Sequence, residues 1–491
     1  MSNEISRRTF LELTAAGAAA TVATPLCAAP WSARSGPVPP PWVPSTKVRV
    51  GKVLFGRARP AWPMASVDLA AEQKRFEAQL ARIQPVLADI ELVDCGLITP
   101  ETNLAPVKEK LQDADGILFL QMTMGCGKVL AELTSLNIPL VLFAEPFCGH
   151  EWHTVAAMQR EGKRIECHAS SRFEDIAIAL RPIRAIRRLK EAKVLHVSNR
   201  PADPAYVKLI REKFGTEIKS LQLPELQAAY NAVDEAAVRA DAESWLRHAA
   251  RKVEPSQEDL LKASRMALAM ANMMKAEGAV AITMNCLGMG LVDRGMGYPC
   301  LGFSRFNSMR LGGICEADLK STMTHLIFNY LVDRPGFVTD PCFDYSNNTI
   351  LHAHCVSALK MEGPEGPTHP YLLRSHLEDN RSVSLQVKLP VNKPVSMARL
   401  IGDNIMLFST GWAVASPLVE RGCRTKLTVR VEHPEKFLET WSSGLHRVIF
   451  YGDHTRDIER FCRLMKIRLV REGTDEVRDV PGLTWLPRVH A

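Results

Sequence analysis

Two carboxylates stand in front of a helical pattern in the segment GGICEADLKSTMTHL, which runs from Gly312 to Leu326. From Leu319 onward the apolar residues recur at helical spacing, which predicts an amphipathic helix with one buried stripe. Glu316, counted back from Leu319, lies at the head of that stripe, whereas Asp318 faces another side. Acidic residues are favoured in a first helical turn by the partial positive charge of its free N–H groups. A carboxylate on the buried side, however, requires a partner, because burying an unpaired charge is costly.

The segment after this helix supplies candidate partners. It has the sequence GFVTDPCFDYSNNTILHAHCVSA, which predicts a short strand with Asp340 at its carboxyl end. Ligands collect at such strand ends in open α/β sheets, so we expect Glu316 and Asp340 at neighbouring element ends. His352 and His354 point to one face of a further strand by its period of two. His446 begins another predicted strand in GLHRVIFYGDH, although each histidine taken alone is more often an ordinary core or surface residue.

These residue types predict a metal site. Two carboxylates that face each other repel unless a cation or a shared proton lies between them. Carboxylates together with a histidine, and without a cysteine pattern, suit a hard or borderline divalent ion such as Mn²⁺ or Mg²⁺ better than structural zinc. The neighbouring Cys315 and Cys355 are interpreted as small buried hydrophobic residues rather than as ligands.

The motifs around these residues resemble those of one enzyme family. The segments PCLGFSRFNSMRLGGICEADL, RPGFVTD and NNTILHAHC are similar to central and C-terminal parts of the L-fucose isomerase family, whose wider group includes the L-arabinose isomerases. CEADL is the most telling of these motifs, and HRVIFYGDH resembles the late segment that carries the family's metal-binding histidine. The resemblance covers roughly Ala279 to Cys355 and the region of His446, and over the first 190 residues it is only architectural.

The resemblance implies a metal-dependent aldose-ketose isomerase that acts on a free sugar of the L-fucose or L-arabinose type through an enediol. In such an enzyme Glu316, Asp340 and His446 would bind the metal, and the two carboxylates would double as the acid and base. Mn²⁺ is the expected metal, with Mg²⁺ and Co²⁺ as alternatives. His354 would contact the substrate or support the ligands. Further candidates for substrate binding, chosen by position only, are Arg305, Asn307 and Asn285.

The resemblance also implies a homo-oligomer. Family members form trimers or hexamers in which the first domain of one subunit can cover the site of its neighbour. The segment EPFCGHEWH, over 145–153, is therefore a candidate rim segment, and a surface loop with incidental histidines is an equal alternative.

The alternation of patterns predicts three domains after a leader. At 491 residues the chain exceeds one ordinary core. Strand-like runs alternate with helical patterns up to about residue 345, which predicts two doubly wound α/β domains, and antiparallel strand patterns follow. The predicted parts are a signal and Pro-rich linker over 1–46, an N-terminal α/β domain over 47–190, a second α/β domain over 191–345 with Glu316 and Asp340, and a β-rich, barrel-like domain over 346–491 with His446.

The N-terminus predicts export. SRRTFLEL followed by TAAGAAATVATPLCAA resembles a twin-arginine signal, which implies the twin-arginine machinery as a partner and a periplasmic or other extracytoplasmic location. A disordered tail that happens to contain Arg7 and Arg8 is the alternative. The apolar run is too short and too rich in Ala and Gly to predict a stable membrane anchor.

The composition of the chain argues against several kinds of binding partner and site. A net charge of +7 spread over 491 residues demands neither nucleic acid nor an acidic membrane surface. Twelve cysteines at irregular spacing, without a CxxC pair, argue against a disulfide framework and against structural zinc. Gly125 and Gly127 could bind an anion at a helix start, but without a GxGxxG or Walker A motif a tight turn is the preferred interpretation.

Two other functions remain open at this level. An exported, non-catalytic sugar-binding protein could share the fold, because fold alone does not decide function. A metal-dependent sugar epimerase would use similar residues. The pair Glu316 and Asp340 favours chemistry, since simple sugar binding has no need of two metal-chelating carboxylates.

Overall fold

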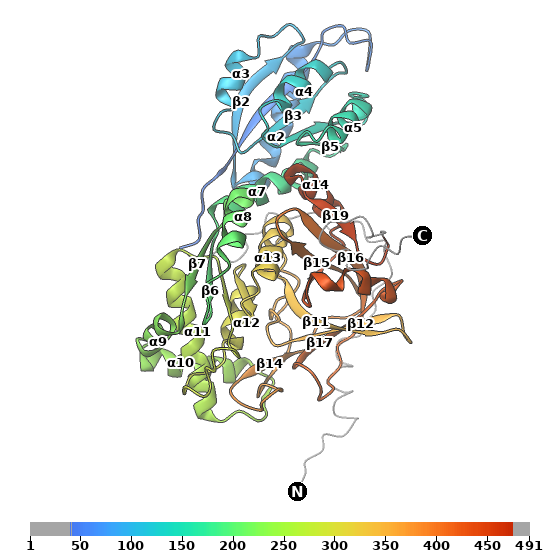
Figure 1. Cartoon of the computed structure of the whole chain (residues 1–491). Helices are drawn as coiled ribbons and strands as arrows, with labels where there is room; N and C mark the ends of the chain where they lie inside the picture. Colours follow the sequence, from blue (N-terminus) through green and yellow to red (C-terminus); the bar gives the residue numbers. More distant parts are fainter. Residues whose placement is uncertain (1–39, 41, 475–491) are drawn as a thin grey trace. The chain divides into compact units, whose positions relative to one another are not determined.

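Two parallel sheets, a small mixed sheet and a closed barrel form the computed structural model, which describes residue 40 and residues 42–474 (Figure 1). These residues belong to one compact unit, Ser35–Ala491. The twin-arginine motif lies outside the described residues, so the export signal stays a prediction. Within the described part, no helix combines the length and the apolar character needed to cross a membrane.

The first sheet, sheet A, has five parallel strands in the order β2-β1-β3-β4-β5. The three central strands β1, β3 and β4 are mostly apolar and are buried along nearly all of their length, which is typical of a parallel sheet covered on both faces. One core cluster joins the sheet to α2, α6 and α7, and another joins it to α3, α4 and α5. The elements are β1 (Val48–Phe55), α2 (Leu69–Ile83), the 3₁₀ helix η1 (Gln84–Leu87), β2 (Ile90–Ile98), α3 (Ala105–Lys110), β3 (Gly116–Gln121), α4 (Gly127–Thr134), β4 (Leu140–Ala144), α5 (Trp152–Arg160), β5 (Ile165–Ala169), the 3₁₀ helix η2 (Phe173–Asp175), α6 (Ile176–Ala179) and α7 (Arg181–Glu191).

The second sheet, sheet B, has four parallel strands in the order β10-β9-β6-β7. Its longest helix, α11, begins with a capping box between Ser256 and Asp259 and ends at Gly278 in the left-handed conformation, which satisfies the free groups at both ends. The elements are β6 (Lys193–Val197), α8 (Pro204–Phe214), β7 (Glu217–Leu221), α9 (Leu223–Asn231), α10 (Glu235–His248), α11 (Gln257–Glu277), β9 (Ala281–Met284), α12 (Cys300–Ser308), β10 (Gly312–Cys315) and α13 (Leu319–Val332).

The C-terminal part is a closed six-stranded barrel. The antiparallel order β15-β18-β11-β12-β17-β16 closes through pairing of β15 with β16, and β19 adds to β16 in parallel. A separate small sheet joins β14, β13 and β8. The elements are β8 (Arg251–Lys252), β11 (Phe337–Asp344), β12 (Thr349–His354), β13 (Tyr371–Arg374), β14 (Ser384–Val387), β15 (Lys393–Ile401), β16 (Ile405–Ala415), β17 (Thr425–Arg430), the 3₁₀ helix η3 (Pro434–Ser443), β18 (Arg447–Tyr451), α14 (Thr455–Met465) and β19 (Arg468–Arg471).

Strand β11 differs from the prediction in length and in sheet. It continues through Asp340 and Pro341 to Asp344, and it pairs with the barrel strands β12 and β18 rather than with sheet B. The proline is tolerated because pairing with β18 stops at Thr339, so the missing N–H removes no ladder bond on that side. Asp340 therefore lies within a barrel strand, and the barrel begins before the predicted boundary at residue 346.

Helix α13 also differs from the prediction, since almost every one of its residues is buried. It contacts β9 and β10 of sheet B and β15 and β18 of the barrel, and Phe328 stacks on Phe450 with ring centroids 4.2 Å apart. Its buried polar side chains form hydrogen bonds inside this core. Thr324, for example, donates to the Lys320 carbonyl and accepts from the N–H of Leu400. The helix is therefore covered on both sides rather than along a single stripe.

Candidate metal centre

Four side chains meet where the turn after β10 faces the barrel. Glu316, Asp340, His354 and His446 each offer one ligand atom, and these atoms all lie within 4.8 Å of one another. His446 Nε2 is 3.2 Å from Glu316 Oε2 and 3.2 Å from Asp340 Oδ1. In an octahedral site with bonds of about 2.1 Å, adjacent ligand atoms lie about 3 Å apart and opposite ones about 4 Å apart. The spacing of the four groups therefore fits one divalent ion.

Three atoms of the cluster are buried without a hydrogen-bond partner among the described residues: Asp340 Oδ1, His354 Nε2 and His446 Nε2. A buried polar atom without a partner is costly, and such atoms are uncommon in native structures. A cation bound between them would satisfy acceptor atoms of this group. The residues thus fit a metal ion, and they do not by themselves specify which one.

A left-handed turn aims Glu316 at this point. Glu316 has φ +62° and Ala317 has φ +54°, and helix α13 begins only at Leu319. Consecutive residues other than glycine in this region are strained, and such strain is found at functional sites. Glu316 is thus not the head of the buried helical stripe that the sequence predicts. The turn carries its carboxylate from the end of sheet B toward the barrel strands.

Asp318, which the sequence placed on another face, supports the same site. Its Oδ1 caps α13 by accepting from the backbone N–H groups of Lys320 and Ser321. Its Oδ2 lies 2.8 Å from His446 Nδ1 and accepts a 3.0 Å hydrogen bond from Arg399. A carboxylate behind a metal-binding histidine fixes the orientation of the ring and the position of its proton. The sequence signals the helix cap, but not the histidine or the arginine that share it.

The two histidines differ in where they carry a proton. The Asp318 carboxylate only accepts, so in the neutral His446 ring Nδ1 carries the hydrogen and Nε2 has a lone pair facing the cluster. His354 Nδ1 instead accepts a 2.9 Å hydrogen bond from the N–H of Cys355, so the neutral ring carries its hydrogen on Nε2. That atom lies 3.7 Å from Glu316 and 3.8 Å from Asp340. His446 is therefore suited to be a metal ligand, and His354 to be a hydrogen-bond donor beside it.

The charges of the cluster already favour a cation at its centre. The neighbouring rings of His354 and His446 hold the pKa of Glu316 well below its ordinary range. Burial alone would raise the pKa of Asp318, but the His446 hydrogen bond and the Arg399 charge hold it well below that range. Burial would lower the pKa of His446, but the Asp318, Asp340 and Glu316 carboxylates around the ring raise it to about 11, so a metal ion that binds Nε2 must replace a proton there.

The site opens on the side of the carboxylates. The Glu316 and Asp340 side chains are 44% and 29% exposed, whereas those of His354 and His446 are 4% and 6% exposed. The histidines thus form a buried floor, and the carboxylates border solvent. A metal site with catalytic function needs such an open position for its substrate.

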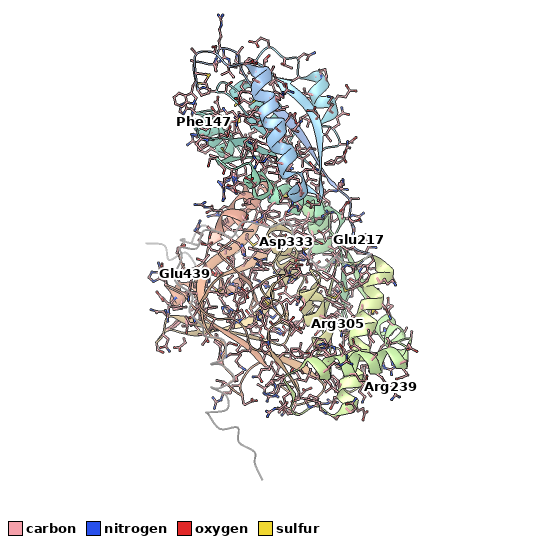
Figure 2. The ribbon with its side chains drawn as sticks, turned by 180° about the vertical axis from the view of Figure 1, so that it is seen from behind. Phe147, Glu217, Arg239, Arg305, Asp333 and Glu439 are labelled. Carbon is pink, nitrogen blue, oxygen red and sulfur yellow. The ribbon has the colours of Figure 1, made fainter. Side chains whose placement is uncertain are left out.

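The candidate substrate-binding residues have other contacts. Arg305 on α12 forms a 2.6 Å ion pair with Asp241, and its guanidinium lies 5.2 Å from the ring centroid of Trp245 (Figure 2). The buried Asn307 ties β10 to the segment after β12, because its amide donates to the carbonyls of Gly313 and Val356. Both amide hydrogens of Asn307 are used within the fold, and its role as a sugar ligand stays a prediction.

Two further predicted residues lie next to the site elements without joining the cluster. Asn285 Oδ1 accepts from the N–H of Gly288 and closes the turn after β9. His352 lies on the same strand as His354, and its Nδ1 is 2.8 Å from the Thr339 hydroxyl inside the barrel.

A carboxylate of the predicted rim segment forms hydrogen bonds with the glycine turn before α4. Glu151 accepts hydrogen bonds from the backbone N–H groups of Gly125 and Cys126, directly before α4. The chain's own carboxylate therefore fills the anion position at this helix start, in agreement with the tight-turn interpretation. Phe147 in the same segment is 55% exposed (Figure 2).

The fold and the site define the class of protein: a chain with two parallel α/β sheets, a closed C-terminal barrel and a cluster that could hold a divalent ion. Comparison with known proteins found no match, either to a protein-family model or to the sequence of a curated protein.

Proposed function

We propose that this protein is a metal-dependent aldose-ketose isomerase that acts on a free sugar of the L-fucose or L-arabinose type. The observation that carries the proposal is the pair Glu316 and Asp340, which borders solvent beside a histidine held in the metal-binding tautomer by Asp318. A protein that only binds sugar needs no such pair. The resemblance of CEADL and HRVIFYGDH to segments of the L-fucose isomerase family also supports it.

In this proposal Glu316, Asp340 and His446 hold the ion, with Mn²⁺ as the first choice and Mg²⁺ or Co²⁺ as alternatives. When bound, such an ion would act as a Lewis acid on the sugar oxygens and favour loss of the proton from C2 of the aldose or from C1 of the ketose. Asp318 keeps the His446 ring oriented, and Arg399 keeps Asp318 ionised.

The reaction itself is a set of proton transfers. One proton moves between C1 and C2 of the sugar by way of an enediol, and another moves between O1 and O2. Glu316 and Asp340 are the members of the cluster with exposed side chains, so we assign these transfers to them. His354 donates a hydrogen bond from Nε2 to a substrate oxygen at the same opening.

The proposal extends to the molecule as a whole. We propose that both α/β domains before the barrel are doubly wound. The order of sheet A and the core clusters on both of its faces support this for the first domain. We also propose a homo-oligomer, a trimer or hexamer, and export by the twin-arginine route. These proposals rest on the family resemblance and on the motif around Arg7 and Arg8.

Proton exchange in D₂O tests the reaction. A panel of aldoses and ketoses is followed by NMR with added Mn²⁺ and again with a chelator, for the native chain, for Glu316→Gln and for Glu439→Gln. Glu439 lies in η3 on the surface and serves as the control (Figure 2). We expect metal-dependent exchange at C1 or C2 with formation of the isomeric sugar, lost in Glu316→Gln and kept in Glu439→Gln.

Other outcomes would change the assignment. Exchange at another carbon would indicate an epimerase. No exchange across the panel, with the metal bound and the sugar bound, would indicate a sugar-binding protein. Full activity in Glu316→Gln would contradict the proposed role of that residue.

A further inference from the structure

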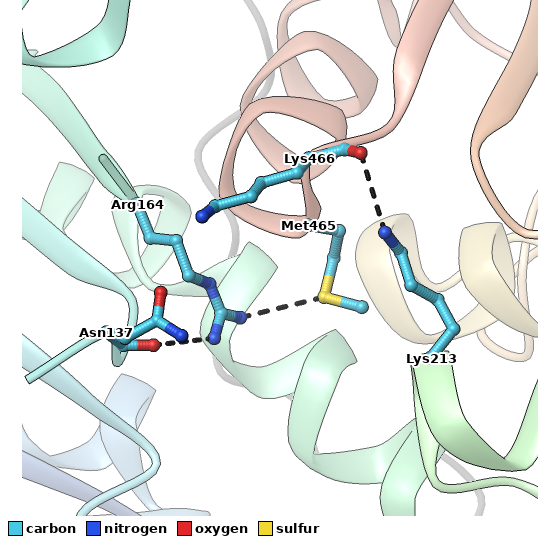
Figure 3. A pocket seen from close by; sticks show the side chains of 5 residues that line it. All are labelled: Asn137, Arg164, Lys213, Met465 and Lys466. Atoms are coloured by element: carbon cyan, nitrogen blue, oxygen red, sulfur yellow. Dashed lines mark hydrogen bonds between the residues drawn. The ribbon is translucent and has the colours of Figure 1, made fainter. Parts of the chain in front are cut away.

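A second polar cavity lies between the loop regions before β4 and β5, helix α8 and the C-terminal end of α14 (Figure 3). Its volume is about 170 Å³, and it contains no residue of the metal cluster. Three of its lining side chains are cations, and none is a carboxylate. The lining residues are Asn137, Arg164, Lys213, Met465 and Lys466.

The three cations lack carboxylate partners in the described part of the chain, since none of them forms an ion pair within 4 Å. Other arginines in the same region are paired, as Arg463 is with Glu166. Burial lowers the pKa of Lys213, the charge of Asp403 opposes this shift, and the smaller effects of Arg164 and Lys466 lower the pKa further. The cavity therefore gathers three cations, and Asp403 offsets only part of their charge.

Backbone carbonyls at the end of α14 offset only part of this charge. Arg164 Nε donates a 2.6 Å hydrogen bond to the Leu464 carbonyl, and another of its nitrogens donates to the Asn137 carbonyl. Lys213 reaches the Lys466 carbonyl at 3.5 Å. Cations are favoured at a helix C-terminus, but the helix supplies only a partial negative charge there. Three full charges exceed what that end can balance.

Lys466 occupies a position that does not favour a lysine. It is the C-cap residue of α14 with φ +52°, a left-handed conformation that glycine adopts without strain. Its ammonium has no hydrogen-bond partner among the described residues, and the side chain extends across the cavity toward Arg164 (Figure 3). Helix capping thus explains the left-handed backbone conformation of Lys466, but it does not explain why the side chain there is a lysine.

We propose that this cavity binds a small phosphate-bearing anion, either inorganic phosphate or the phosphate group of a monoester. A guanidinium and two ammonium groups suit a tetrahedral dianion, because its several oxygens accept from all three at once. A single carboxylate would neutralise only one of the three charges. Bound there, the anion joins the end of sheet A to α8 and α14, which carry the cations.

Calorimetric titration of the full chain tests this proposal. Inorganic phosphate and glycerol phosphate are titrated separately at constant ionic strength, with a chelator present so that no metal ion competes for them. We expect one saturable site. Tighter binding of glycerol phosphate identifies a monoester as the ligand, and equal or tighter binding of inorganic phosphate identifies the free ion.

Lys466→Gly separates binding from folding. Glycine suits the left-handed C-cap, so we expect the melting temperature without phosphate to be kept or raised, and the phosphate affinity to fall at least tenfold. Lys213→Gln should weaken binding similarly. Lys208→Gln is the matched control, because Lys208 lies on the same helix and pairs with Glu212 on the surface.

Binding should also persist in Glu316→Gln, which distinguishes this cavity from the metal centre. Absence of saturable binding to either probe would overturn the proposal. Unchanged affinity in both Lys466→Gly and Lys213→Gln would overturn it as well.

Discussion

Asp318 uses its two carboxylate oxygens for different tasks, one for the cap of α13 and one for His446 and Arg399. Asp318→Asn keeps a good N-cap residue but replaces the charged acceptor behind the histidine with an amide. We expect Mn²⁺ affinity to fall by about 10- to 100-fold with little loss of thermal stability. Calorimetric titration with Mn²⁺ measures the affinity.

The control for this change is Asp234→Asn. Asp234 caps α10 by accepting from the N–H of Ala237, and it belongs to no metal cluster. Its replacement should leave Mn²⁺ affinity unchanged. Equal affinities for native protein and Asp318→Asn would show that the carboxylate does not orient His446.

The two histidines of the cluster should respond differently to the same substitution. His446→Phe removes the nitrogen with a free lone pair, so we expect Mn²⁺ binding to be lost. His354→Phe removes an N–H donor, so we expect the metal to remain bound while sugar turnover falls by on the order of 100-fold or more. Electron paramagnetic resonance of free and bound Mn²⁺ distinguishes the two. If His354→Phe also releases the metal, His354 is a fourth ligand.

At the scale of residues, the sequence predicts the members of the cluster better than the residues that support them. Glu316, Asp340 and His446 could be selected as candidate metal ligands because carboxylates and histidines in recognisable sequence motifs indicate metal binding. Asp318 and His446 are 128 positions apart in the chain, and Asp318 and Arg399 are 81 apart. Pairs at such separations depend on how the barrel meets α13, which no local pattern encodes.

At the scale of elements, α13 depends on a buried neutral histidine. His325 Nδ1 accepts from the N–H of Gly336, and its Nε2 lies 3.2 Å from the Leu311 carbonyl, so the ring joins the start of β10 to the start of β11. Burial lowers the pKa of His325 to about 4. Protonation would put a hydrogen on the nitrogen that now accepts, and would bury a charge.

The sign of the pH dependence follows from this depressed pKa. Because the folded value lies below the ordinary value of 6.5, the stabilisation is present above about pH 6.5 and is lost as the pH falls toward 4. We expect native protein to lose on the order of 2 to 3 kcal/mol more than His325→Gln between pH 7 and pH 4.5. Urea unfolding with a chelator present measures the difference.

His248→Gln is the control for this experiment, since His248 is exposed on α10. Its replacement should leave the acid dependence of the native protein unchanged. An equally steep loss of stability in native protein and in His325→Gln would show that His325 does not carry this dependence.

The helices and strands could be predicted where one hydrophobic pattern dominates the local sequence. The apolar strands of sheet A and the alternation with helices indicate parallel sheets, as the structure has them. Two elements were not. Pro341 suggested a strand end, although the ladder with β18 simply stops before it, and α13 was expected to be half exposed although sheet B and the barrel cover it on both sides.

At the scale of the whole molecule, the metal centre joins parts that fold around different sheets. Glu316 extends from the end of β10 in sheet B, whereas Asp340 lies in the barrel and His446 directly precedes a barrel strand. The unfolded chain does not bring these residues together, so an ion bound to the cluster would stabilise the folded state by mass action. At a free metal concentration 100 times the Kd this contribution is about 2.7 kcal/mol.

We therefore expect saturating Mn²⁺ to raise the melting temperature of the metal-free protein by roughly 2 to 5 °C, since a chain of this length shifts less per kcal/mol than a small domain does. Differential scanning calorimetry of the chelator-treated protein, with and without Mn²⁺, measures the shift. Glu439→Gln should show the full shift and Glu316→Gln little or none. A shift of equal size in Glu316→Gln would place the stabilising ion elsewhere, because the link between sheet B and the barrel passes through that carboxylate.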